Sequence, residues 1–481
     1  MIGANDLGLG VFLTGHQGIG FKGILIAGTE EQKQKYLPRL STGELFAAFA
    51  LTEPASGSDA GSISTRAELS ECGQFWRITG SKIWITGGGL ADVMTVFAKA
   101  VDKEGQEKMA AFIVERSFGG VSHGPAEKKM GIKCSNTAEV YFDSTPVPVE
   151  NVLGGVGNGF KVAMQILNNG RFGMGTTLSG TMRSIISRVS EHVTSRQQFG
   201  SRLDSFGTIQ EKIARMSMIH YANESMAYMV SGTMDGGYDD YQLEAAVSKV
   251  FSSEAAWLVT DEAIQILGGM GYMRNTGLEK MMRDLRIFRI FEGTNDILRL
   301  FIALTGMQYA GKHLKHLQQS VKNPLSNMGS LVSEAGKRTR TKLGLATSHL
   351  NVHPNLSEPA DTLCADVVQF GDVVEKLLMK HQKNIIHQQF LLNRVSEAAI
   401  DLYVVVCVLS RCSDTISQGL ESAQHEERMT RVWCGEAHSR IRRNLSMISD
   451  QASLEDFRSM SDISRAVTAG LGPVQAHPIG V

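Results

Sequence analysis

The spacing of apolar residues changes twice along the chain, and these changes constrain the fold more than any other feature. Up to about Glu44 the spacing is helical, and Thr29 is a candidate N-cap for a short helix over Gln32–Leu40. From Leu45 the apolar residues alternate with the period of a β-strand. After the glycine-rich run Gly154–Gly159 the spacing becomes helical again. The sequence therefore predicts an α+β fold, with helical segments before and after a β-domain.

Runs rich in aromatic and β-branched residues predict the strands, and long proline-poor runs predict the helices. The expected strands are Phe46–Leu51, Phe75–Ile78, Ile83–Thr86, Val93–Ala98, Ala110–Val114 and Ala138–Phe142. The expected helices are Phe160–Leu167, Gly173–Phe199, Ser205–Thr233, Tyr241–Leu267, Asp296–Tyr309, Asp361–Met379 and Ile385–Arg411. Helices of this length packed side by side form a bundle.

Four domains follow from these changes of period. They are a helical segment over 1–44, a β-domain over 45–153, a helical bundle over 154–310 and a helical extension over 311–481. The extension opens with a basic amphipathic segment, 312–345. Such a segment either lies on an anionic membrane surface or packs on its own domain, and Pro324 and Gly329 would interrupt it as a helix.

Composition narrows the possible partners. The chain has 481 residues, with 48 Lys and Arg against 49 Asp and Glu, so no overall positive charge favours nucleic acid. Its six cysteines include no C-x-x-C pair, which argues against a zinc site and against a disulfide framework. No apolar run approaches the roughly 20 residues needed to cross a bilayer. The sequence predicts no metal site, and the first residues lack a secretory or mitochondrial targeting pattern.

A single acid stands out in the run Arg286–Ile297. Glu292 follows an apolar and basic segment and precedes a glycine, where a carboxylate can be desolvated and still be approached by a substrate. This position favours a general base. The run by itself is more typical of an exposed acid at a helix N-terminus.

Four other runs carry residues suited to binding. Ala50–Asp59 offers hydroxyls and backbone N–H groups on a loop, although a plain turn has the same composition. Lys82–Thr86 carries a tryptophan that either stacks on a planar ring or fills the core. Glycines end a long helix in Gln265–Tyr272, and Arg196–Phe199 precedes Gln210. No G-x-G-x-x-G lies between a strand and a helix, so a Rossmann nucleotide site is unsupported.

Together these runs resemble the acyl-CoA dehydrogenases over about Gly3 to Met307. One motif of that family reads here as Leu51-Thr52-Glu53-Pro54-x-x-Gly57-Ser58-Asp59. A second reads Gln265-x-x-Gly268-Gly269-x-Gly271-Tyr272-x-x-Asn275-x-x-x-x-Lys280-x-x-x-Asp284. The resemblance implies an acyl-CoA dehydrogenase fold with a middle β-barrel domain and a C-terminal bundle, and FAD as the cofactor.

The resemblance implies a flavin between the β-domain and the bundle. Thr52 would bond the ring edge, and Trp84 and Thr86 would flank the ring. The residues expected to contact FAD are Phe49, Thr52, Ser58, Trp84, Ile85, Thr86, Arg196, Phe199, Gln210, Gln265, Gly268, Gly269, Thr294, Asn295 and Asp296. Arg196, Phe199, Gln210 and the run Gln265–Gly269 would hold the adenine and pyrophosphate across a dimer interface.

The resemblance also implies the roles around the substrate. Glu292 would remove the α-proton of an acyl-CoA, and the β-hydrogen would leave as hydride to give a trans-2-enoyl-CoA. Ser58, Phe291 and Gly293 would flank the thioester, and Arg171 would lie close to the base. In long-chain and isovaleryl relatives the base comes from an earlier helix, where this chain has Gly170, which cannot serve.

Chain-length preference is partly readable from Gly15. Medium-chain relatives place a glutamate near this position at the pocket floor, so a glycine would open room for a longer acyl tail, each buried CH₂ adding roughly 0.8 kcal/mol. The alternative is that the glycine only serves helix packing.

The region beyond Met307 resembles the extension of the very-long-chain branch and of a sister branch linked to respiratory complex I assembly. Lys128–Lys133 and Gly159–Met164 are closer to the very-long-chain enzymes. The resemblance implies a mitochondrial homodimer on the matrix side of the inner membrane. It would oxidise long-chain acyl-CoA and pass electrons to electron-transferring flavoprotein; the alternative is an assembly factor with the same fold. The N-terminal helical domain starts partway through, so we expect a short isoform, a partial gene model or a trimmed chain.

Overall fold

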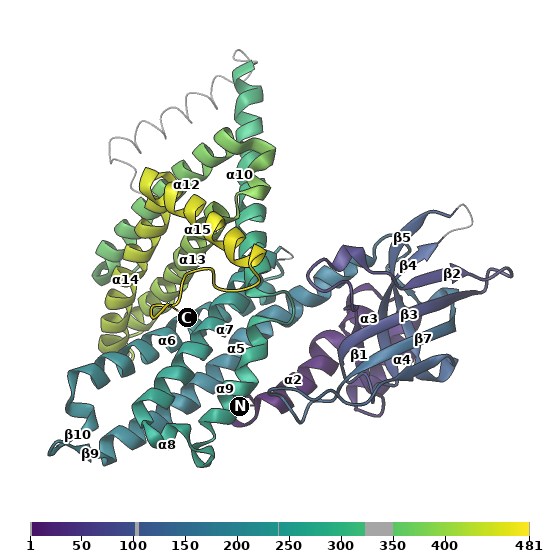
Figure 1. Ribbon diagram of the computed structural model, residues 1–481, viewed down its shortest axis with the longest axis horizontal. Coiled ribbons are helices and arrows are strands. Elements are labelled where there is room, and N and C mark those ends of the chain that lie inside the picture. Colours follow the sequence, from purple (N-terminus) through teal and green to yellow (C-terminus); the bar gives the residue numbers. More distant parts are fainter. Residues whose placement is uncertain (1, 102–104, 239, 323–349, 481) are drawn as a thin grey trace. The chain divides into compact units, whose positions relative to one another are not determined.

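The computed structural model describes residues 2–101, 105–238, 240–322 and 350–480, and for 312–322 it describes the backbone alone. The chain forms two compact units, Met1–Ile297 and Leu298–Val481 (Figure 1). The basic segment 312–345 lies outside the residues whose side chains are described. Among the helices described, none has the length and apolar character that crossing a bilayer requires.

Short helices begin the first unit. They are α1 (Ile2–Asn5), α2 (Leu7–Thr14), the π-helical turn η1 (Gly15–Gly20), α3 (Lys22–Ala27) and α4 (Glu30–Ser41). The predicted N-cap is confirmed, because the Thr29 hydroxyl accepts from the Gln32 N–H while the Gln32 side chain accepts from the Thr29 N–H at 2.9 Å. The Gln32 amide also donates to the carbonyls of Glu150 and Val152, which ties α4 to the last strand of the sheet.

The sheet domain lies next to these helices in Figure 1. Its strands are β1 (Ala47–Ala50), β2 (Arg66–Leu69), β3 (Phe75–Thr86), β4 (Val93–Val101), β5 (Glu107–Glu115), β6 (Val121–His123), β7 (Thr137–Pro148) and β8 (Val152–Leu153). Hydrogen bonding orders the described strands as β6-β7-β3-β2-β4-β5-β8, with β1 parallel to β4. The inner faces pack as a core that includes Met94, Val96, Phe112 and Val140.

The strands differ from the sequence prediction in two ways. The predicted runs Phe75–Ile78 and Ile83–Thr86 belong to one strand, β3, because Gly80 at φ +152° lets the strand continue through a shift in its register with β7. The short strands β2, β6 and β8 were not predicted. They have two to four residues each, too few for an alternating pattern to be recognised.

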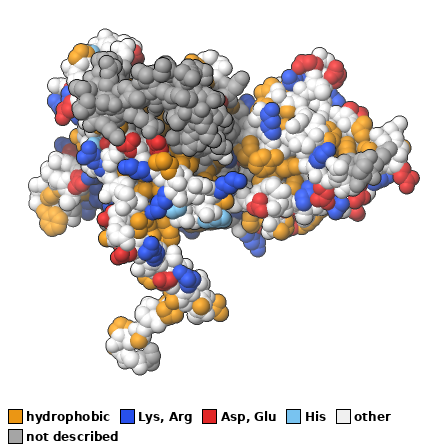
Figure 2. Space-filling view, turned by 90° about the horizontal axis from the view of Figure 1, so that it is seen from above, with side chains coloured by type: hydrophobic (Ala, Val, Ile, Leu, Met, Phe, Trp, Pro, Cys, Tyr) orange, Lys and Arg blue, Asp and Glu red, His pale blue; other side chains and the backbone are white. Residues whose placement is uncertain are grey.

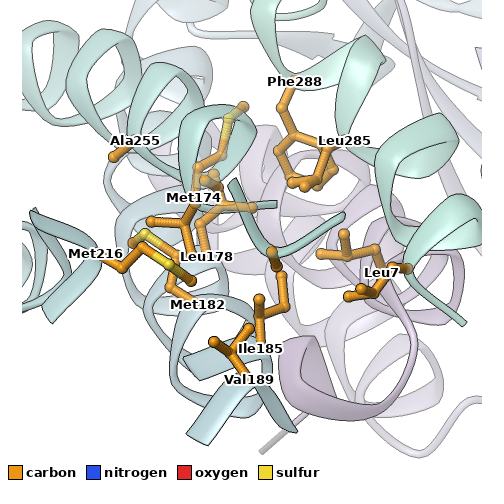
Figure 3. Packing of buried hydrophobic residues seen from close by; sticks show 14 of the residues in the cluster. Leu7, Met174, Leu178, Met182, Ile185, Val189, Met216, Ala255, Leu285 and Phe288 are labelled. Atoms are coloured by element: carbon orange, nitrogen blue, oxygen red, sulfur yellow. The ribbon is translucent and has the colours of Figure 1, made fainter. Parts of the chain in front are cut away.

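A helical bundle completes the first unit. Its main helices are α5 (Gly159–Ser195), α6 (Gly207–Asp235), α7 (Gln242–Leu267) and α9 (Leu278–Leu285), with the four-residue α8 (Gly269–Tyr272) and the hairpin β9 (Gln197–Gln198) and β10 (Ser201–Arg202). Leu7 of α2 belongs to the same buried cluster as Met174, Leu178 and Met182 of α5, and all four are labelled in Figure 3. The N-terminal helices therefore share a core with the bundle.

The bundle corrects one predicted break. The expected helices Phe160–Leu167 and Gly173–Phe199 are joined in the single helix α5, which ends at Ser195, so the predicted end at Phe199 is wrong. The sequence Asn168–Gly173 suggested a break, yet the side chain of Asn169 donates to the carbonyl of Gln165 one turn back and to Tyr241 on the neighbouring α7 segment. Burial of Gly170 and Arg171 then outweighs the low helix propensity of this stretch.

The helix α10 (Asn295–Lys322) begins in the first unit and continues in the second, which adds α12 (Ser357–His381), α13 (Gln389–Ser417), α14 (Ala423–Ser449) and α15 (Gln451–Ala469). The predicted start of α13 at Ile385 is wrong, since a 3-10 turn occupies Gln382–His387. On the face drawn in Figure 2, basic and acidic side chains are interspersed.

Candidate active site

Glu292 lies in a turn between two helical elements. The 3-10 turn η7 (Arg286–Arg289) precedes it and α10 follows it. Glu292 has φ +55° and Gly293 has φ +91°, so both residues adopt left-handed backbone conformations. A residue with a side chain rarely adopts this conformation unless its surroundings hold it there.

The Glu292 carboxyl group is desolvated. Its Oε2 atom is buried and accepts no hydrogen bond from any described residue. Burial raises the pKa of Glu292 to about 7, against the smaller opposing effects of Arg171 and Lys249. A carboxyl group of this kind can take up a proton at neutral pH, which the exposed acid considered from the sequence could not do as readily.

Two buried cations hold the backbone of this turn. The Arg171 Nε donates to the carbonyl of Glu292 at 3.1 Å, and the Lys249 Nζ donates to the carbonyl of Gly293 at 2.8 Å. Both side chains are buried within the bundle, Arg171 on α5 and Lys249 on α7. The turn is therefore fixed to two helices through two consecutive carbonyl groups.

Gly170 provides the space for the acid. A Cβ atom added to Gly170 would lie 2.6 Å from Glu292 Oε2 and 3.0 Å from Oε1. Position 170, where long-chain and isovaleryl relatives carry the base, therefore cannot carry a side chain while the Glu292 carboxyl group lies here. This agrees with Glu292 as the candidate base.

A buried ion pair holds the loop that carries Thr52. Glu53 accepts from the Lys82 Nζ at 2.7 Å, and both side chains are almost completely buried. Glu53 also accepts from the backbone and hydroxyl groups of Ser64 and Thr65, while the Ile83 N–H donates to the Thr52 carbonyl at 2.9 Å. The Thr52 loop is thereby joined to strand β3. Sequence reasoning gave Glu53 and Lys82 no role.

Trp84 projects from the end of β3 into solvent. The register of β3 with β7 shifts between Lys82 and Ile85, and Trp84 within that bulge has φ +57° and is 65% exposed. The alternative of a core tryptophan is therefore wrong. Ile85 beside it is buried, and Thr86 is half-buried. A bulge that turns a large aromatic ring outward is typical of a binding surface.

Phe49 and Gly15 lie beside this part of the sheet. The Phe49 ring packs on Phe97 with ring centroids 5.1 Å apart, so it is partly a core residue. A Cβ atom on Gly15 would approach Thr86 Cγ2 to 2.5 Å. The space at Gly15 is therefore filled by Thr86, which favours the helix-packing alternative over an enlarged acyl pocket.

A second group of predicted residues lies at the far end of the bundle. Arg196 follows the C-terminus of α5, roughly 37 Å along the helix axis from Arg171. The exposed members of this group are Arg196, Phe199, Gln210, Gln265, Gly268 and Gly269. Phe199 is 95% exposed with φ +52°, and Gly268 ends α7 with φ +57°. One chain thus does not bring these residues together with Glu292.

The remaining predicted residues lie around the turn or on the Thr52 loop. Phe291 packs against Phe288, and the Thr294 hydroxyl accepts from the Ile297 N–H at the start of α10. Asn295 is buried, whereas Asp296 and Ser58 are exposed. Lys249 was missed in the sequence. Its signal is a lysine inside the otherwise small and apolar run Ala245–Val250, which indicates a buried cation with a specific partner.

The parts of the chain match known domains. Residues 1–44, 48–145 and 157–306 match the N-terminal, middle and C-terminal domains of acyl-CoA dehydrogenase, and 354–472 match "ACAD9/ACADV, C-terminal domain". The helices, the sheet domain and the bundle around a desolvated acid define an acyl-CoA dehydrogenase fold. The chain belongs to the acyl-CoA dehydrogenase family.

Within that family, the chain is similar to the very-long-chain members. It is 56% identical to the mitochondrial very long-chain specific acyl-CoA dehydrogenase of Bos taurus and 55% identical to that of Homo sapiens, over 100% of this chain and 75% of each relative. A crystal structure of an acyl-CoA dehydrogenase complexed with FAD from Bacillus anthracis aligns with a TM-score of 0.81. That protein is 34% identical, over 94% of this chain and 78% of its own.

Proposed function

We propose that this chain catalyses the FAD-dependent α,β-dehydrogenation of long- or very-long-chain acyl-CoA to trans-2-enoyl-CoA in fatty acid oxidation. The observation that carries the proposal is the buried, unpartnered Oε2 of Glu292, on an acid with a pKa of about 7. Bound FAD supplies the two-electron acceptor that takes the β-hydrogen as hydride.

Glu292 removes the proton from the α-carbon. This C–H is a weak acid, so the base must be positioned and the thioester carbonyl must be polarised as negative charge develops on its oxygen. The Glu292 N–H is a suitable donor for that oxygen, because among the described hydrogen bonds none is donated by it. Arg171 and Lys249 hold the turn that presents both groups.

The residues of the sheet domain fit a flavin ring. The Thr52 carbonyl accepts from the Ile83 N–H of β3, and the Thr52 side chain is half-buried. Trp84 presents an exposed aromatic face at a backbone bulge, which suits stacking on a planar ring. Thr52, Trp84 and Thr86 would hold the ring, with Phe49, Ser58 and Ile85 beside them.

The far group of predicted residues fits the opposite end of a cofactor held by a second copy of the chain. Arg196 and Glu292 lie at positions too far apart along the bundle for a single dinucleotide. Exposed Phe199 offers a stacking ring to an adenine, and the open glycines Gly268 and Gly269 let a pyrophosphate approach the backbone closely. We therefore propose a homodimer in which each FAD contacts both chains, with Thr294, Asn295 and Asp296 completing the site.

We place this enzyme at the matrix side of the inner mitochondrial membrane, with electron-transferring flavoprotein as its acceptor. The location follows from its mitochondrial relatives, and peripheral membrane binding follows from the sequence of segment 312–345. A complex I assembly factor remains the second candidate because the 354–472 domain is shared by both branches. Identity over the whole chain favours the dehydrogenase.

The test is to saturate the purified full chain with FAD and supply palmitoyl-CoA with an electron acceptor. We expect trans-2-hexadecenoyl-CoA as the product, with two electrons passed to the acceptor for each enoyl-CoA formed. A chain that retains FAD and forms no enoyl product from acyl-CoA of any length would overturn the proposal. Co-purification with complex I intermediates by an inactive chain would favour the assembly factor.

A further inference from the structure

Lys249 is a fully buried cation that the acid–base chemistry described above does not use directly. It lies near the start of α7 with its side chain inside the bundle. An ammonium group is strongly destabilised away from water unless its donors are satisfied and its charge has a function or a partner. The groups that Lys249 contacts therefore indicate what it does.

The Lys249 Nζ contacts the loop of the proposed base on both sides of Thr294. It donates to the Gly293 carbonyl at 2.8 Å and to the Asn295 Oδ1 at 2.9 Å. The Asn295 side chain is fixed in turn, because its Nδ2 donates to Glu254 at 2.8 Å and to Ser253 at 3.0 Å. Lys249 is thus connected to a polar network within the bundle.

That network continues toward the surface. Glu254 pairs with the Arg289 Nε at 2.9 Å, and the Arg289 guanidinium lies over the Trp257 ring at 5.8 Å. Arg289 ends the turn η7, three residues before Glu292. The residues before and after Glu292 are therefore both attached to α7, through Glu254 and Lys249.

The Glu292–Gly293 segment depends on external contacts. Both residues have positive φ values, and a glutamate with φ +55° is disfavoured unless its surroundings hold it. Arg171 holds the carbonyl of Glu292 from α5, and Lys249 holds the next carbonyl from α7. The removal of Lys249 leaves the Gly293 carbonyl without its cation and lets this segment relax.

We propose that Lys249 is a positioning residue that holds the Glu292–Gly293 turn in its left-handed conformation and so aims the Glu292 carboxylate at the substrate α-carbon. This inference deepens the proposed function and rests on it. The positive charge of Lys249 also acts on the base, because it opposes the rise in the Glu292 pKa that burial causes. Two independent effects follow from its loss, one on geometry and one on pH dependence.

The test compares Lys249→Met, which removes the charge and the donor, with Lys249→Gln, which removes the charge and keeps a donor. Thr260→Val on the same helix is the control, since Thr260 is equally buried and its hydroxyl donates to the Ala256 carbonyl within α7, away from the Glu292 turn. Each FAD-loaded protein is mixed anaerobically with palmitoyl-CoA, and the rate of flavin bleaching is measured from pH 6 to pH 9. The crystal structure of Lys249→Met reports the φ of Glu292.

We expect Lys249→Met to keep FAD, to bleach about 100-fold more slowly at saturating palmitoyl-CoA and to show a higher apparent pKa. Lys249→Gln is expected to show the same rise in apparent pKa with a smaller loss of rate, and it decides the test if Lys249→Met does not fold. Thr260→Val should lose thermal stability with its pH profile unchanged. The inference would be overturned if the Lys249 variants bleached at the wild-type rate with the wild-type pH profile. It would also be overturned if Thr260→Val showed the same loss of rate and the same rise in apparent pKa.

The crystal structure separates this inference from the proposed function. If wild-type protein retains FAD and is bleached by no acyl-CoA, the proposed function fails. In that case the φ angle of Glu292 in the Lys249→Met crystal structure still tests whether Lys249 positions the turn. A value that leaves the left-handed region in Lys249→Met supports the positioning role, and an unchanged value overturns it.

Discussion

Arg171 contacts Glu292 through the backbone, since its Nε donates to the Glu292 carbonyl oxygen at 3.1 Å and its terminal nitrogen donates to Asn168 at 2.9 Å. The guanidinium therefore does not form a carboxylate ion pair, which would hold the acid ionised and weaken it as a base. Arg171 instead fixes the conformation of the turn and leaves Oε2 of the carboxyl group free for a proton. Arg171 thus positions the acid through the backbone, while the carboxyl group keeps a pKa that burial raises to about 7.

The first prediction concerns the pH dependence of catalysis. Burial raises the pKa of Glu292 to about 7, and the base acts only when it is deprotonated. We therefore expect kcat/KM for palmitoyl-CoA to rise with pH through an apparent pKa near 7 and to reach a plateau above it. Steady-state rates from pH 5.5 to pH 9 check this. A profile that is flat between pH 5.5 and pH 8 would contradict a desolvated carboxylate base.

The second prediction uses two glycines on α5. Gly170→Ala adds a Cβ atom 2.6 Å from Glu292 Oε2, so the carboxyl group must move, and we expect kcat to fall about 100-fold with FAD retained. Gly173→Ala is the matched control, because apart from the backbone of its own helix no atom of the described residues lies within 4 Å of its added Cβ. It should keep full activity and gain roughly 0.5–1 kcal/mol of helix stability. Equal activity in the two variants would show that Gly170 does not accommodate the acid.

The third prediction concerns the buried pair Glu53–Lys82. Burial alone would raise the pKa of Glu53, but Lys82, Ser64 and Thr65 lower it to about 2. The pair thus contributes stability above pH 4.5, and this contribution is lost as the pH falls toward 2. Lys82→Met leaves an uncompensated carboxylate, and we expect a loss of about 3–5 kcal/mol and weaker FAD binding.

Denaturant unfolding and flavin release measure these two effects. Lys33→Met is the control, because its pair with Glu30 at 2.9 Å is exposed to solvent and should contribute less than about 1 kcal/mol. The account of the Thr52 loop would be wrong if Lys82→Met were as stable as Lys33→Met and released flavin no faster than wild type.

The fourth prediction concerns stability at Glu292 itself. Its carboxyl group holds its proton to about pH 7 when folded but loses it near pH 4.5 when unfolded, so stability falls as the pH rises between these values. Glu292→Gln has no such titration. With saturating FAD, the melting temperature of Glu292→Gln should exceed that of wild type, and the excess should be larger at pH 8 than at pH 5. The change in this excess between the two pH values corresponds to at most about 3 kcal/mol of unfolding free energy. The same difference at both pH values would contradict burial of the charge.

Much of the fold and of the candidate site could be predicted because each depends on local patterns. Period changes located the sheet domain and the long helices, and the residue type of Thr29 identified the N-cap of α4. Two features could not be predicted. The continuous helix α5 depends on burial that overrides the weak propensity around Gly170, and the outward Trp84 depends on a bulge set by its pairing with β7.

The positioning residues were missed for a different reason. Lys249 and Glu53 act through contacts with residues distant in sequence, at Gly293 and at Lys82. A pattern read along one strand or helix does not contain such contacts. The glycine at position 15 was ambiguous for the same reason, because its neighbour Thr86 lies in another part of the chain.

The central claim is that Glu292 removes the α-proton, and it is tested most directly by rapid anaerobic mixing of FAD-loaded Glu292→Gln protein with palmitoyl-CoA. The flavin absorbance of wild-type protein should fall rapidly after mixing, as FAD is reduced. The Glu292→Gln protein should bind FAD and palmitoyl-CoA and bleach about 10⁴-fold more slowly, since an amide cannot accept the proton. Bleaching of Glu292→Gln at the wild-type rate would contradict the assignment of Glu292 as the base.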